Sequence, residues 1–86
     1  APVEIQLAQN AAGLARTDAA IAQARSQIVQ ADAAAVEAEK ALERARALMR
    51  SGNTTEAVLE QRVAAAQAAE GRASAAREGL AIAEAE

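Results

Sequence analysis

A seven-residue repeat of apolar residues runs through the first half of this chain and constrains its fold more than any other feature. The leading series is mostly large: Leu7, Leu14, Ile21, Ile28, Ala35, Leu42 and Met49. A second series follows three residues after each of the first six and is mostly small: Asn10, Thr17, Ala24, Ala31, Ala38 and Ala45. On an α-helix both series form one stripe, and a sustained heptad predicts a left-handed supercoil with a partner helix.

Charged residues recur with the same period and predict the solvated side of this helix. They are Asp18, Arg25, Asp32, Glu39 and Arg46. We place them opposite the apolar stripe, so that one side of the helix is buried and the other faces water.

The repeat stops at the segment 51–55, which predicts a hairpin turn. Gly52 suits a left-handed helix C-cap, and Asn53, Thr54 or Thr55 can cap the next helix. Asn53 followed by Glu56 resembles a capping box.

The second half has its own stripe, made of Leu59, Ala66, Ala73 and Leu80 interleaved with Arg62, Ala69, Ala76 and Ala83. Folded back, it predicts an all-α chain, a long antiparallel two-helix coiled-coil hairpin with arm one at about 4–51, the turn at about 52–54 and arm two at about 55–86. Arg62 stands at a buried-type position, where it either snorkels to the surface or pairs with Glu43.

The two arms differ in length, at roughly 70 and 50 Å for a rise of about 1.5 Å per residue. Either arm two is cut short at Glu86, or arm one breaks near 10–18, where Gly13 interrupts the apolar stripe. We expect a continuous helix.

Composition narrows the function classes. The chain of 86 residues has 29 alanines, no aromatic residue, no cysteine and no histidine, so most catalytic and metal-binding templates fail. Acidic residues such as Glu37, Glu39 and Glu43 have the spacing of a solvated helix face. We therefore expect no enzyme, no cofactor and no metal.

Charge and hydropathy argue against two further classes of partner. The net charge of −3 disfavours nucleic acid, and no apolar run is long enough for this segment to insert into a membrane. We therefore expect a protein that works by contacting other helices.

Arg44 and Leu48 form a candidate contact pair beside the turn. They stand one helical turn apart on the flank of the apolar stripe, which would expose an apolar and a cationic side chain together. In the alternative interpretation Leu48 broadens the buried stripe and Arg44 complements the helix dipole.

The turn resembles the tip of the α-helical hairpin in periplasmic adaptor proteins, or membrane fusion proteins, of the HlyD and AcrA type. That family carries Arg-x3-Leu-x6-Ser at the tip, and Arg44-x3-Leu48-x6-Thr55 keeps this spacing with threonine for serine. The surrounding text ALERARALMRSGNTTEAVLEQRVAAAQ has a similar alanine-rich register, and the opening APVEIQLAQNAAGLA is similar to the segment that leaves the first lipoyl half-motif.

The resemblance implies a role in the periplasm. The hairpin would belong to an inner-membrane-anchored adaptor, associate with neighbouring hairpins and dock its tip on a TolC-like outer-membrane channel for efflux or type I secretion. Arg44, Leu48 and Thr55 would make the channel contacts. The inner-membrane transporter would be bound through lipoyl, β-barrel and membrane-proximal domains outside these residues, so we expect the chain to be a fragment of a larger adaptor.

Two other readings stay open. One is a structural coiled-coil protein whose hairpins dimerise into a four-helix bundle, because the alanine stripe is thin. The other is an amphipathic lipid-binding or desiccation-protection helix, which the regular heptad disfavours.

Overall fold

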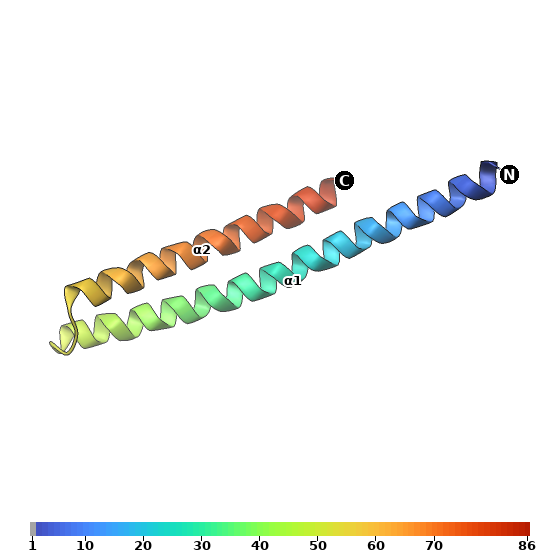
Figure 1. The fold of residues 1–86 in the computed structure, drawn as a ribbon. Helices are drawn as coiled ribbons and strands as arrows, with labels where there is room; N and C mark the ends of the chain where they lie inside the picture. Colours follow the sequence, from blue (N-terminus) through green and yellow to red (C-terminus); the bar gives the residue numbers. More distant parts are fainter. Residues whose placement is uncertain (1) are drawn as a thin grey trace.

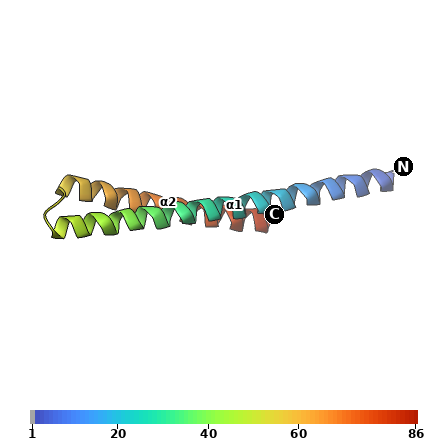
Figure 2. The same cartoon turned by 90° about the horizontal axis from the view of Figure 1, so that it is seen from below.

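The chain folds into two long helices joined by a short turn. The computed structural model describes residues 2–86, with α1 at Pro2–Arg50 and α2 at Glu56–Ala85. The helices run antiparallel, lie side by side in Figure 1 and cross in Figure 2, within overall dimensions of 76 × 13 × 13 Å. The expected all-α antiparallel coiled-coil hairpin is confirmed.

Helix α1 is continuous through the segment where a break was conceivable. Its 49 residues include Gly13, whose carbonyl oxygen accepts a hydrogen bond of 3.0 Å from the hydroxyl of Thr17. Because the Thr17 hydroxyl bonds back to the preceding turn of the same helix, its side chain is satisfied within α1 and does not cap a new helix. The prediction of one unbroken first helix is therefore confirmed.

The interface between the helices, called the seam below, follows the predicted heptad. Its buried residues are Ala24, Leu42 and Ala45 on α1 and Ala66, Ala69 and Ala73 on α2. Ile21, Ile28 and Leu80 are half-buried beside them. Leu42 is the only large side chain among the buried residues of the described chain, so the seam is thin and the helices pack closely.

The first two leading positions of the repeat do not lie in the seam. Leu7 and Leu14 are 63% and 67% exposed. Glu84, near the end of α2, pairs with Arg25, so within the described residues α2 does not reach the first turns of α1. The expectation that these two leucines are buried is wrong for this arrangement of the helices.

The predicted solvated side of α1 is in fact a flank of the seam. Arg25 pairs with Glu84 at 3.8 Å, and Asp32 pairs with Arg77 at 2.6 Å across the two helices. In a heptad this charged series directly follows the small series of the seam, so it points sideways and reaches the partner helix. Four of the five charged residues are exposed, as expected, but placing the series opposite the seam was wrong.

Between residues 2 and 86, neither helix has a stretch apolar and long enough to cross a lipid bilayer.

Candidate functional site

The turn is built as a helix stop followed by a helix start. Gly52 adopts φ +77°, and the amide of Asn53 donates to the carbonyl of Leu48 at 2.8 Å while that of Gly52 donates to Met49 at 3.1 Å. These two bonds form a Schellman motif with Gly52 in the left-handed conformation. The predicted C-cap at Gly52 is confirmed.

Thr55 begins the second helix. Its backbone is extended, and its hydroxyl oxygen accepts a hydrogen bond of 3.3 Å from the amide of Val58. The capping box expected from Asn53 and Glu56 is not formed, because the Asn53 side chain donates to the hydroxyl of Ser51 at 3.0 Å instead. Thr55, two residues later, is the residue that satisfies the free amide of the first turn.

Leu48 is held firmly by this turn. Its carbonyl oxygen accepts from the amide of Asn53 and also from the hydroxyl of Ser51, at 3.0 Å. Its side chain is 46% exposed, so it is not part of the seam. The fixed backbone and the open side chain together make Leu48 a rigid apolar contact point next to the turn.

Arg44 and Leu48 line one hollow beside the turn, called the tip hollow below. Its volume is about 350 Å³, and its lining comes from both helices and the turn: Ala41, Arg44, Ala45, Leu48, Thr54, Val58 and Arg62. The structure therefore brings two of the three predicted site residues together. Thr55 does not line this hollow. It follows the lining residue Thr54 in the sequence and is the N-cap of α2.

Arg62 is exposed, so it does not occupy the seam position that the heptad gave it. Its neighbour Val63 is half-buried in its place. The alternative of a pair with Glu43 is wrong as well, because Glu43 pairs with Arg46 at 3.2 Å on the same helix. Arg62 instead lines the tip hollow from α2, whereas Arg44 lines it from α1.

Five lining residues of the tip hollow were not predicted as site residues: Ala41 and Ala45 on α1, and Thr54, Val58 and Arg62 from the turn and α2. A signal for the last three existed in the sequence, since they stand four residues apart and such residues share one side of a helix. Sequence spacing alone did not say that this side of α2 turns toward Arg44.

The functional groups that line the tip hollow are of few kinds. Among residues 2–86, no group of three or more potential ligands could hold a metal ion, and the lining offers methyl groups, one hydroxyl and two guanidiniums. These groups suit the recognition of another protein surface, with an apolar anchor and charged donors around it.

Comparison with known proteins gives no relative: no protein family, no curated protein and no solved structure matches this chain.

Proposed function

We propose that this chain is the hairpin of a periplasmic adaptor, which bridges an inner-membrane transporter to a TolC-like outer-membrane channel by docking its tip on channel helices. The observation that carries the proposal is the pairing of Arg44 and Leu48 in one open hollow at the tip, at the spacing from Thr55 that the adaptor family uses. A helical strut with an apolar anchor and cationic donors at its end is suited to reversible docking.

The proposal assigns a separate role to each part of the chain. The two helices hold the tip far from the other end of the molecule, over a length of 76 Å. Leu48 provides apolar area, and Arg44 provides hydrogen-bond donors that suit carbonyl or carboxylate groups on the channel. Thr55 sets where α2 begins and so holds the α2 side of the tip in place.

A transport assay with Leu48→Ser tests the proposal in cells that express the whole adaptor. We expect transport to fall to the level of a strain without the adaptor, while helix content by circular dichroism stays unchanged. Leu14→Ser is the matched control, because Leu14 is an exposed leucine of the same helix far from the turn. Normal transport with Leu48→Ser would contradict the proposal.

A second candidate function is a structural coiled coil in which two hairpins form a four-helix bundle. The observation that favours it is the set of large apolar side chains exposed along α1 away from the tip, including Leu7, Leu14, Val29 and Val36. Sedimentation of the isolated chain separates the two candidates. A tight dimer that buries Leu48 favours the bundle, and a monomer or a dimer that leaves Leu48 accessible favours the adaptor.

A further inference from the structure

The tip hollow combines an apolar floor with two cations that come from different helices. Ala45 is 4% exposed, Leu48 and Val58 present larger apolar side chains, and Arg44 and Arg62 stand on the α1 and α2 sides. Apolar area makes a segment bind, and charges around it decide which segment binds. The composition of the hollow therefore carries information about the partner.

Neither arginine is neutralised within the described residues. The ion pairs of residues 2–86 join Arg25 to Glu84, Arg46 to Glu43 and Arg77 to Asp32, and no acidic residue lines the tip hollow. Glu43, which one of the two alternatives paired with Arg62, pairs with Arg46 instead. The hollow thus presents two positive charges without a counter-charge.

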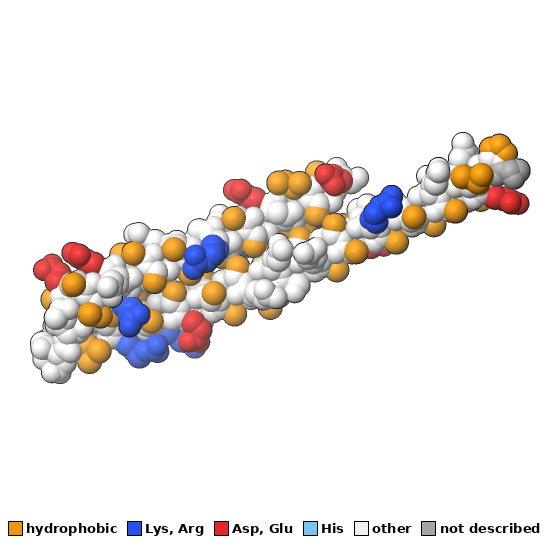
Figure 3. Space-filling model, in the orientation of Figure 1, with side chains coloured by type: hydrophobic (Ala, Val, Ile, Leu, Met, Phe, Trp, Pro, Cys, Tyr) orange, Lys and Arg blue, Asp and Glu red, His pale blue; other side chains and the backbone are white. Residues whose placement is uncertain are grey.

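The charge of the tip is opposite in sign to that of the whole chain. Residues 40–62 contain five basic and three acidic side chains, whereas the complete chain has a net charge of −3. Figure 3 shows Lys and Arg side chains gathered over the end of α1 nearest the turn. A local field of this sign attracts a partner surface that is acidic.

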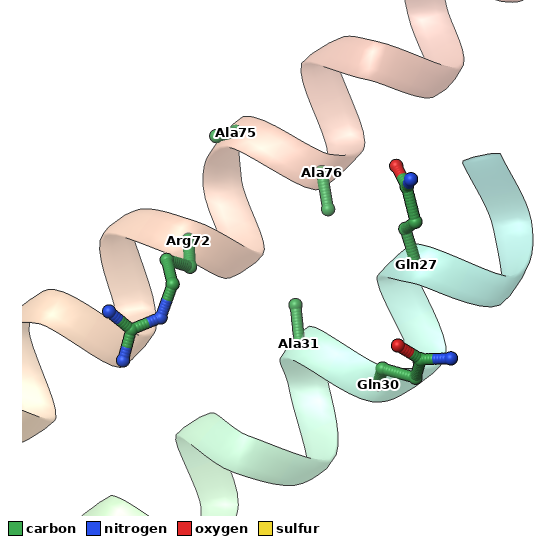
Figure 4. A pocket seen from close by; sticks show the side chains of 6 residues that line it. All are labelled: Gln27, Gln30, Ala31, Arg72, Ala75 and Ala76. Carbon is green, nitrogen blue, oxygen red and sulfur yellow. The ribbon is translucent and has the colours of Figure 1, made fainter.

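A second hollow, farther along the same two helices, lacks the larger apolar side chains and the second arginine of the tip hollow. It contains Arg72 alone among cations, and its other lining residues are glutamines and alanines. In Figure 4, Ala31 and Ala76 point toward one another across it, and it has no leucine or valine. Arg72 is therefore a natural control for Arg62, since both lie on α2 and only Arg62 has an apolar anchor and a second arginine beside it.

We infer that the tip hollow recognises a carboxylate side chain carried on an apolar helical segment of the partner, and that Arg62 is a specificity-determining residue for that segment together with Arg44. The inference rests on the proposed function, because the partner segment is taken to be the docking end of the channel. The partner's apolar side chains contact Leu48 and Val58, while its carboxylate lies between the two guanidiniums, where each can donate hydrogen bonds to it.

Crosslinking of a cysteine at Ala47 to channel proteins, in cells with the whole adaptor, tests the inference, because Ala47 is an exposed neighbour of Leu48 that does not line the tip hollow. The crosslink yield is compared in four backgrounds: no further change, Arg62→Glu, Arg62→Lys and Arg72→Glu. We expect Arg62→Glu to lower the yield about tenfold, which corresponds to roughly 1.4 kcal/mol. Arg62→Lys keeps the positive charge but not the planar donor geometry, so it should lower the yield less than Arg62→Glu does. Arg72→Glu reverses a charge outside the tip hollow and should keep the yield within about twofold. Circular dichroism confirms that each variant keeps its helices.

The outcomes separate the inference from the function on which it rests. An unchanged yield with Arg62→Glu, or an equal loss with Arg72→Glu, overturns the inference and leaves the adaptor function standing. The complete absence of a channel crosslink in the first background overturns both. A loss specific to Arg62→Glu that is restored by changing one channel carboxylate to arginine supports the inference and identifies the carboxylate.

Discussion

The guanidinium of Arg77 lies 2.6 Å from the carboxylate of Asp32, although the two residues are 45 positions apart in the chain. A second pair, Arg25 with Glu84, stands one heptad away on both helices. Because the pairs keep the same spacing on α1 and on α2, they mark the antiparallel register of the hairpin.

The next position in this register holds two acids, which predicts a stabilising substitution. Glu39 and Glu70 line the same two hollows on the flank of the seam, where like charges oppose each other. Glu70→Arg should extend the row of cross-helix pairs and raise the free energy of unfolding by about 0.2–1 kcal/mol at low salt. Urea denaturation measures the change, and Glu78→Arg, also exposed on α2, is the control. Equal effects of both variants would argue against the register.

The alanine seam predicts a strong penalty for larger side chains. Ala73 is fully buried at 0% exposure, whereas Ala75, two residues away, is exposed. Ala73→Leu should lower the free energy of unfolding by about 1–3 kcal/mol, because the helices must separate to admit the extra atoms. Ala75→Leu should leave it nearly unchanged. Thermal unfolding of the two variants checks this, and a stabilised Ala73→Leu would show that the helices are not this close.

Replacement by alanine should have opposite effects on the stability of the hairpin at Gly52, in the turn, and at Gly71, in α2. Gly52 has φ +77°, and Gly71 lies in the middle of α2; a Cβ atom would find open space at either position. Gly52→Ala should destabilise the hairpin by about 1–2 kcal/mol through backbone strain alone. Gly71→Ala should stabilise it by about 0.5–1 kcal/mol, because alanine favours the helix. Thermal unfolding decides, and a neutral Gly52→Ala would contradict the Schellman geometry.

Alanine and serine in place of Thr55 should change the stability of the hairpin by different amounts. Its hydroxyl caps α2 by accepting from the amide of Val58, and serine can do the same. Thr55→Ala should therefore cost about 1 kcal/mol of stability, while Thr55→Ser should cost little. Chemical denaturation measures both. If Thr55→Ala proved neutral, the hydroxyl would not be acting as a cap.

Much of the fold was predictable, because the heptad specifies which side of each helix is buried. The seam from Thr17 to Ala45, the continuous first helix and the C-cap at Gly52 all follow from residue type and spacing. These features are local, or they depend on a periodicity that the sequence states directly.

One detail that failed depends on how the second helix is rotated about its axis beside the turn. Arg62 is exposed, and Val63 is half-buried at the seam position expected for Arg62. The spacing of apolar residues predicts which residues form the stripe, but not how far α2 is rotated about its axis near the turn. For the same reason, the sequence named Arg44 and Leu48 as candidate contacts but did not identify Arg62 as the third side chain of the hollow. The misplaced charged series of α1 is a separate error, because its heptad position beside the small series already implied a flank of the seam.

Crosslinking from Ala47→Cys in the periplasm, within the whole protein, is the most direct test of docking at the tip, because it leaves Leu48 in place. If the tip docks on the channel, a specific crosslink to the tip of an outer-membrane channel forms, and it is lost when Arg44→Asp reverses the charge of the neighbouring lining residue. Crosslinks that join Ala47→Cys only to a second copy of the same chain would contradict the adaptor function and favour the self-associating coiled coil instead.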